Sequence, residues 1–222
     1  MNNKKDINIA IFGLGTVGSS LVKLITKEKK RISNSLNLNL NLVSISSRKL
    51  PQSLVKYKKI FTKKNKLYED KNVDVVIELI GGVDVAYEFV SNALINKKHV
   101  ITANKELIAT KGSVLMNLAK KNKCKLFFEA SVAGAIPILK SIYSFLKGND
   151  FKRIVGILNG TSNYILTDIF RNKTSFKESL SKAKKLGYAE ADPAFDIEGT
   201  DVAHKLVILS SMITQTFPKL SS

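Results

Sequence analysis

The sequence gathers acidic residues around one lysine near residue 200. Five of the eighteen carboxylates fall within twelve positions, although the chain carries a formal net charge of +18. These five are Glu190, Asp192, Asp196, Glu198 and Asp201. Pro193 and Gly199 interrupt any helix across them, so we expect an acidic loop that leads into a helix beginning near Thr200. Within that helix Asp201 and Lys205 stand four residues apart and share a face.

A lysine among carboxylates has two interpretations. Lys205 could pass a proton to a reacting oxygen while the neighbouring acids bind a cationic substrate amine. It could instead form an ordinary exposed ion pair with Asp201, which would contribute about 0.3–0.5 kcal/mol. Spacing alone favours the ion pair, whereas the motifs in the rest of the chain favour proton transfer.

Composition limits the class of protein. A chain of 222 residues that is 44% apolar can bury a proper core, in one large domain or two small ones. No apolar run is long enough to span a membrane and the first residues lack a signal-peptide pattern, so we expect a cytoplasmic protein that binds no membrane. The single cysteine, Cys124, excludes an internal disulfide and any multi-cysteine metal site within the chain.

The positive charge raises the question of nucleic acid, which clustered Lys and Arg would bind through its phosphates. The distribution of the charge argues against this. Lysine is spread along the whole chain, only four of the thirty-six basic residues are arginine, and no basic stretch is rich in aromatic residues. A nucleic-acid binder therefore remains only an alternative, and no nucleic-acid partner is expected.

A glycine motif follows the first apolar run. Residues 6–12 read as a strand, residues 13–18 are Gly-Leu-Gly-Thr-Val-Gly, and a helical pattern follows over 19–29. In a dinucleotide fingerprint the first glycine permits a tight turn, the second admits the pyrophosphate, and the third allows close helix–strand packing. The residues expected to bind the cofactor here are Phe12, Gly13, Leu14, Gly15, Thr16, Val17 and Gly18.

The second strand, over residues 40–47, indicates which dinucleotide is preferred. Cofactors without a 2′-phosphate usually meet an Asp or Glu near the end of this strand. Here Ser46, Ser47, Arg48 and Lys49 occupy that place, which suits a phosphate. The pattern favours NADP and leaves NAD possible.

The alternation of strands and helices continues to residue 129. Strands are expected at 73–80, 99–103 and 125–129, with helices at 86–96 and 111–121. The first of these strands ends in glycines, including Gly81, that let the backbone approach a ligand, and Lys105 follows the second strand at the same edge. We therefore predict an α/β fold, with a Rossmann-like doubly wound parallel sheet over residues 1–130.

A second, substrate-binding domain is expected over residues 131–222. Its pattern predicts helices at 138–146, 162–170 and 175–186 and a strand at 153–158. The polar residues 159–163 could cap the helix that follows or line a polar pocket, and the sequence leaves both open.

Six motifs in order resemble homoserine dehydrogenase over nearly the whole chain. They are the glycine turn at 13–18, Glu-Leu-Ile-Gly-Gly at 78–82, Thr-Ala-Asn-Lys at 102–105, Phe-Glu-Ala-Ser-Val-Ala-Gly at 128–134, Gly-Ile-Leu-Asn-Gly-Thr at 156–161 and the acidic stretch at 187–205. The resemblance implies interconversion of L-aspartate 4-semialdehyde and L-homoserine with a nicotinamide cofactor, on the route to threonine and methionine. It also implies a homodimer formed through the substrate domain.

The resemblance further implies roles for particular residues. Lys205 would handle the proton on the substrate oxygen, and Arg48 would lie by the 2′-phosphate. The residues implied at the substrate are Glu190, Asp201, Gly187 and Lys105, with Lys105 and Gly81 also at the cofactor. A sodium ion would be held, largely by main-chain oxygens, at Glu129, Val132, Gly134 and Ile136, and such hard oxygen donors suit this cation.

The chain departs from the family at its end. Family members continue well past the helix that carries Lys205, whereas this sequence stops at Ser222. The α+β substrate domain is therefore expected to be incomplete and a threonine-sensing domain absent. The alternative to an active enzyme is a catalytically inactive nucleotide-binding remnant.

Overall fold

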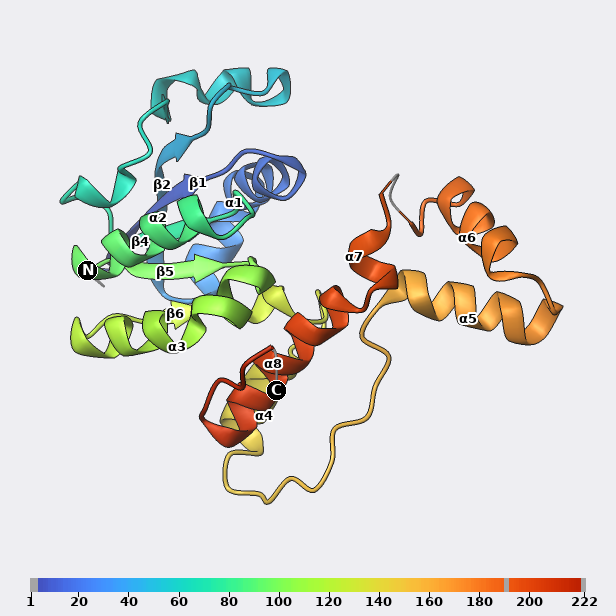
Figure 1. The fold of residues 1–222 in the computed structure, drawn as a ribbon. Helices are drawn as coiled ribbons and strands as arrows, with labels where there is room; N and C mark the ends of the chain where they lie inside the picture. Colours follow the sequence, from blue (N-terminus) through green and yellow to red (C-terminus); the bar gives the residue numbers. More distant parts are fainter. Residues whose placement is uncertain (1–3, 190–191, 221–222) are drawn as a thin grey trace. The chain divides into compact units, whose positions relative to one another are not determined.

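The computed structural model describes residues 4–189 and 192–220 (Figure 1). The chain divides into two compact units, residues 1–134 and residues 135–222. The sequence placed the boundary at residue 130, four positions earlier.

The first unit is built on a six-stranded parallel sheet with the order β3-β2-β1-β4-β5-β6. Its strands are β1 (Lys5–Phe12), β2 (Leu38–Ser46), β3 (Phe61–Thr62), β4 (Val75–Glu78), β5 (His99–Thr102) and β6 (Leu126–Phe127). The chain runs outward from β1 through β2 to β3, returns to β4 beside β1, and then runs outward in the other direction. This is the doubly wound topology, so the predicted fold class is confirmed.

Helices cover the sheet. They are α1 (Thr16–Ser35), α2 (Asp84–Ile95) and α3 (Lys105–Lys121), with short 3₁₀ helices at Gln52–Ile60, Leu67–Glu69 and Glu129–Ser131. Helix α1 packs on β1 and β2, while α2 and α3 pack on each other and on β4, β5 and β6. Right-handed crossovers in opposite directions place the two groups on opposite faces of the sheet. The strand order reverses between β1 and β4, and ligands of such sheets bind at the carboxyl edge there.

The core of this unit is formed by β-branched residues on its strands. Ile11 of β1, Ile45 of β2 and Val76 of β4 are fully buried. A strand of a parallel sheet is buried on both faces, which explains why these stretches read as continuous apolar runs rather than as alternating ones. The buried sheet gives the loops at its carboxyl edge a rigid base.

The regular elements among the described residues of the second unit are all helices. Its helices are α4 (Ile138–Phe145), α5 (Gly160–Asn172), α6 (Phe176–Lys185), α7 (Ala194–Ile197) and α8 (Thr200–Thr214). Helix α5 pairs with α6, α7 contacts both α5 and α8, and α4 packs on α8. Helix α8 begins at Thr200, where the sequence placed it, because Gly199 adopts a left-handed conformation (φ 80°) that any other residue would strain to reach.

The strand predicted at 153–158 is wrong. Residues 151–159 have no regular structure, and Val155 and Ile157 are 80% and 75% exposed. A strand exists only where a second segment accepts and donates its ladder of hydrogen bonds. Among residues 135–189 and 192–220, no segment pairs with this one.

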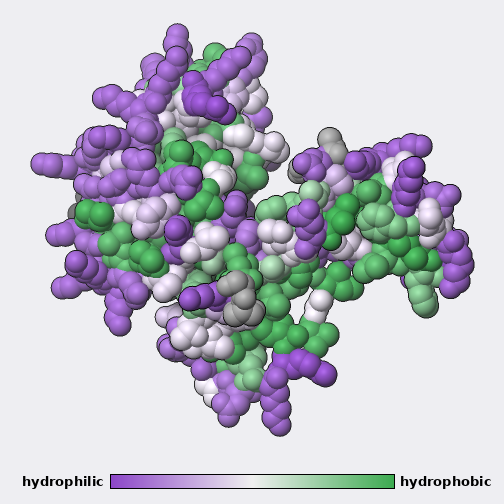
Figure 2. Space-filling view, viewed as in Figure 1, coloured by the Kyte–Doolittle hydropathy of each residue, from purple (hydrophilic) through white to green (hydrophobic). Residues whose placement is uncertain are grey.

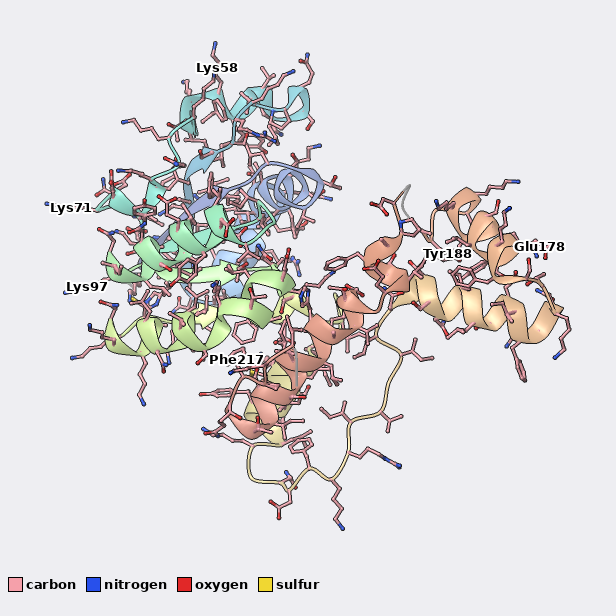
Figure 3. The ribbon with its side chains drawn as sticks, viewed as in Figure 1. Lys58, Lys71, Lys97, Glu178, Tyr188 and Phe217 are labelled. Atoms are coloured by element: carbon pink, nitrogen blue, oxygen red, sulfur yellow. The ribbon has the colours of Figure 1, made fainter. Side chains whose placement is uncertain are left out.

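Most of the lysines among the described residues lie on the surface. Figure 3 shows Lys58, Lys71 and Lys97 projecting outward from the first unit, and Figure 2 shows polar side chains over most of the visible face of that unit. Apolar side chains gather instead on α5 of the second unit, where Leu166 and Phe170 are 66% and 77% exposed. No helix in the described part of the chain has both the length and the apolar character needed to cross a membrane.

Candidate functional site

The glycine turn between β1 and α1 uses each glycine differently. A Cβ at Gly13 (φ 104°) would lie 2.5 Å from the Leu79 carbonyl oxygen, and one at Gly18 would lie 1.9 Å from the Gly13 carbonyl oxygen. A Cβ at Gly15 would meet no atom within 4 Å. The outer two glycines are therefore required by the fold, whereas the middle one leaves open space where a ligand could approach the backbone.

The first turn of α1 faces that space without a side-chain cap. Gly15 is the N-cap residue and has no side-chain acceptor, and the first turn contains no acidic residue. The first intrahelical bond is donated by Ser19 N to Gly15 O, which leaves the preceding N–H groups without an acceptor in the helix. Exposed N–H groups and the helix dipole together favour an anion such as a pyrophosphate.

Basic residues meet at the carboxyl ends of β2 and β3. Arg48 and Lys49 follow β2 and are exposed. Ser46 Oγ donates a 2.6 Å bond to the Lys64 carbonyl oxygen, which holds the loop after β3 against the end of β2. The sequence contains no Asp or Glu between residues 29 and 68, so no carboxylate of this region can bind a ribose hydroxyl.

A hydrogen-bonded network shapes the edge at β4 and β5. Glu78, the last residue of β4, is fully buried and accepts bonds from Ile80 N (2.7 Å) and Thr102 Oγ1 (2.6 Å). Asn104 donates from its backbone N to Thr102 Oγ1 (2.9 Å) and from Nδ2 to the Gly82 carbonyl oxygen (2.6 Å). Asn104 also caps α3 by accepting from Leu107 N, so that half-buried Lys105 is the first residue of the helix.

The second unit holds the lysine that the acidic stretch singled out. Lys205 Nζ lies 2.7 Å from Asp201 Oδ2 and 2.6 Å from the Leu158 carbonyl oxygen. The side chains of Lys205 and Asp201 are 19% and 4% exposed. The shared face predicted from their spacing is confirmed, and the exposed ion pair is not what the structure contains. A contact this sheltered from water is screened much less than a surface pair.

The residues at 159–163 both cap a helix and contact the acidic stretch. Asn159 Oδ1 accepts from Ser162 N, which caps α5. Asn159 Nδ2 donates to Asp201 Oδ2 (2.8 Å) and to Asp196 Oδ1 (2.7 Å). Thr161 Oγ1 lies 2.8 Å from Asp196 Oδ2, so two carboxylates and an ammonium share one polar cluster.

The other predicted residues fall in irregular backbone. Gly187 (φ 78°) follows α6 at an exposed turn, and Glu190 lies outside the described residues. Of the four residues assigned to sodium, Val132 is 1% exposed and Ile136 is 61% exposed. Ala133 and Ala135 have left-handed φ angles of 49° and 69°. The main-chain oxygens of this turn therefore do not point in the directions of a regular helix or strand. No group of three His, Cys, Asp or Glu side chains in the described residues could hold a metal ion.

The sequence analysis missed the contributions of three residues. It placed Glu78 and Thr102 in motifs without giving either a role, although a carboxylate that ends a buried apolar strand was a visible signal. It counted Asp196 among the acids but did not connect it to Asn159, because the two residues are thirty-seven positions apart and nothing local links them.

Two family models match the chain in succession. The model for "Homoserine dehydrogenase, NAD binding domain" matches residues 13–129, which is more than half of the chain, and the model for "Homoserine dehydrogenase" matches residues 137–222. The chain belongs to the homoserine dehydrogenase family. The recognition made from the motifs is therefore confirmed, and the first unit is a nicotinamide dinucleotide-binding domain of this family.

Individual family members agree with this assignment. The homoserine dehydrogenase of Bacillus subtilis is 40% identical over 215 residues, which cover 94% of this chain and 49% of the relative. The crystal structure of a homoserine dehydrogenase from Thiobacillus denitrificans has a TM-score of 0.87 at 38% identity and covers 95% of this chain and 49% of its own. A hyperthermophilic archaeal homoserine dehydrogenase in complex with NADPH has a TM-score of 0.82 at 29% identity, covering 96% and 71%. The chain spans about half the length of the curated relatives it matches.

Proposed function

We propose that this chain carries the catalytic residues of an NADP-preferring homoserine dehydrogenase, which interconverts L-aspartate 4-semialdehyde and L-homoserine in threonine and methionine biosynthesis. One observation supports this above the others: Lys205 Nζ is fixed by Asp201 and the Leu158 carbonyl oxygen in a sheltered cluster of helix α8. An ammonium group has three hydrogens, and these two acceptors use two of them. The third is directed to a substrate oxygen.

The bound nicotinamide supplies the hydride, and the protein supplies orientation and proton control. In the reducing direction Lys205 donates a proton to the aldehyde oxygen as the alcohol forms, and in the oxidising direction it accepts that proton. Asp201 keeps the ammonium in place, because its Oδ2 atom accepts from both Lys205 and Asn159. Glu190 and Asp201 bind the substrate amine, and Gly187 lets the backbone turn beside it.

The dinucleotide lies on the glycine turn. Gly15, Thr16 and Val17 are exposed there, and the uncapped N-terminus of α1 binds the pyrophosphate. Arg48, at the end of β2, binds the 2′-phosphate, and the lack of carboxylates from residue 29 to 68 supports NADP over NAD. Gly81 and Lys105 flank the cofactor at β4 and β5.

A sodium ion is held by main-chain oxygens in the turn that includes Glu129, Val132, Gly134 and Ile136. The left-handed residues Ala133 and Ala135 support this, since they keep the turn out of regular helix or strand. The Ile136 oxygen already accepts from Ile138 N at 2.8 Å, and a carbonyl oxygen keeps a second lone pair for a cation.

The chain forms a homodimer through its second unit. The exposed apolar segment at Val155 and Ile157 supports this, because side chains of this kind are usually covered by another surface.

The test of the proposed function is a pair of measurements on the purified chain. Reduction of NADP or NAD in the presence of L-homoserine is followed by nicotinamide absorbance, and NADPH binding is followed by its fluorescence. We expect homoserine-dependent reduction with a higher kcat/KM for NADP than for NAD. NADPH binding without any turnover would instead support the inactive remnant, and absence of both would contradict the assignment of function.

A further inference from the structure

We propose that Glu78, Thr102 and Asn104 form a positioning network for the nicotinamide half of the dinucleotide. The inference rests on the proposed function and adds residues to it. None of the three is assigned there to the cofactor. They act through the backbone turns that they hold, at the ends of β4 and β5.

The network joins two turns that come from different strands. Glu78 ties the Ile80 N–H to the Thr102 hydroxyl, and that hydroxyl accepts from Asn104 N. Asn104 then returns to the first turn by donating to the Gly82 carbonyl oxygen. The circuit is therefore closed, and neither turn can move without stretching a bond to the other.

The turns so held lie against the glycine turn. Gly81 and Gly82 both adopt left-handed conformations, with φ angles of 74° and 70°. The Leu79 carbonyl oxygen would lie 2.5 Å from a Cβ at Gly13, and Leu79 N donates to the Phe12 carbonyl oxygen. The network thus fixes backbone that contacts the dinucleotide turn directly, and it fixes the helix start that carries Lys105.

Stability alone is a poor reason for this arrangement. Glu78 is fully buried, and removing a carboxylate from water is costly even when it is hydrogen-bonded. An apolar residue at the end of β4 would match the rest of the strand. A buried carboxylate that accepts one N–H and one O–H instead fixes the positions of the two groups that donate to it. A nicotinamide ring that reacts must likewise be held in one position.

The position of the network predicts which half of the cofactor it serves. In a sheet of the order 3-2-1-4-5-6, one mononucleotide-binding half consists of the strands on the β1, β2 and β3 side and the other of the strands on the β4, β5 and β6 side. The 2′-phosphate is proposed to bind at the end of β2, in the first of these halves. The nicotinamide half therefore binds at the ends of β4 and β5.

Thr102→Val tests this, because valine matches threonine in shape and lacks only the hydroxyl. Two ligands are titrated into the full chain: NADPH, and 2′-phospho-ADP-ribose, which lacks the nicotinamide. We expect the Kd for NADPH to rise about tenfold, as the loss of a buried hydrogen-bonded group implies. The Kd for 2′-phospho-ADP-ribose should stay unchanged. Thr102→Ser, which keeps the hydroxyl, should bind NADPH as the wild type does.

Lys98→Met is the matched control. Lys98 is also buried and donates to the Asp70 and Val73 carbonyl oxygens, at the opposite ends of the same strands. Its loss should lower the melting temperature and leave both affinities unchanged. The inference is overturned if Thr102→Val binds NADPH like the wild type, or if it weakens both ligands equally. If the wild-type chain binds neither ligand, the proposed function is wrong and this inference fails with it.

Discussion

At the scale of single residues, the pairing of Lys205 with Asp201 carries two functions that substitution can separate. The lysine neutralises a carboxylate that is 4% exposed, and we propose that it also provides the transferable proton. Alanine would remove both at once, and it would leave a buried charge with fewer partners. Arginine keeps the positive charge but does not release its proton in proteins.

We therefore predict that Lys205→Arg retains the fold and loses turnover. Initial rates of homoserine oxidation should fall by about 10²-fold or more, the usual contribution of a positioned acid or base. The melting temperature should remain near that of the wild type. Lys177→Arg, on the exposed surface of α6, is the control and should change neither quantity. Turnover close to the wild-type rate in Lys205→Arg would remove the proton-transfer role.

Residue-level prediction from sequence succeeded where the contact was local. The spacing of Asp201 and Lys205 within one helix was enough to place them together. The two interpretations of residues 159–163 could not be separated, because Asn159 uses its oxygen as a helix cap and its amide group as a donor to distant acids. The structure confirms the helix cap and shows that the same side chain also bonds to the acidic residues, whereas a pocket lined by residues 159–163 stays a prediction.

At the scale of elements, the glycine turn contains glycines that the fold requires and one, Gly15, that we propose is required for cofactor binding. Gly18→Ala would place a methyl group 1.9 Å from the Gly13 carbonyl oxygen, whereas Gly15→Ala would meet no protein atom within 4 Å. Gly15 has a φ of −67°, which alanine adopts without strain.

We predict that these two variants fail in different ways. Gly18→Ala should unfold at a lower temperature than the wild type, because the backbone must shift to admit the methyl group. Gly15→Ala should melt near the wild-type temperature and bind NADPH at least tenfold more weakly, since the added methyl occupies the approach of the pyrophosphate. Thermal melts and NADPH titrations of both variants decide this, and equal NADPH affinity in Gly15→Ala would contradict it.

Asp168 of α5 is a buried carboxylate that contacts Ser179 and Lys182 of α6. Hydrogen bonds from Asn172, Ser179 and Thr174, together with Lys182, hold the pKa of Asp168 well below the usual range. A depressed folded-state pKa stabilises the protein above the unfolded-state pKa of about 3.9, and this stabilisation is lost as the pH falls through the folded-state value.

Asp168→Asn should therefore lower the melting temperature at neutral pH. The difference from the wild type should stay constant down to about pH 5 and shrink as the pH falls below about 4, because the wild type then loses the same charge. Melting curves across that range measure it. Asp150→Asn, on an exposed residue, should show little difference at any pH. A gap that widens on acidification would mean that the carboxylate is not the stabilising form.

The elements themselves were predictable to different degrees. Five of the six parallel strands of the first unit were predicted, because apolar runs of strand length alternate there with helical patterns. The two-residue strand β3 was missed, because it lies in a polar, lysine-rich stretch. The segment at 153–158 has the same apolar character, yet it forms no strand. Apolar residues show that a segment is suited to a sheet, but the pairing partner is a property of the remaining fold.

At the scale of the whole molecule, the chain consists of two units that divide the proposed work. The residues proposed to bind the dinucleotide lie in residues 1–134, and Lys205 with its acidic partners lies in residues 135–222. The order of motifs along the sequence predicts a boundary at residue 130, and the chain divides into compact units after residue 134. Amino-acid composition did not predict the division into two units, because lysine is abundant on the surface of both.

Association through the second unit is the prediction that belongs to this scale. The double variant Val155→Ser, Ile157→Ser should shift the chain toward monomer in sedimentation velocity, because it removes exposed apolar surface. NADPH affinity should not change, since the substitutions lie in the other unit. Val114→Ser, at an exposed apolar position of α3, is the control for a general change in solubility. A wild-type chain that sediments as a monomer at all concentrations would contradict the proposed homodimer.

The amide group of Asn159 donates to Asp196, in the short helix α7, and to Asp201, in helix α8. The two elements are thereby coupled at a single rigid planar group. A ligand that moves the acidic loop would also displace the amide group of Asn159. Because this amide group is bonded to Asp201, the displacement would reach the carboxylate that holds the Lys205 ammonium. In the proposed enzyme, substrate binding and alignment of the Lys205 ammonium would then occur in one movement rather than two.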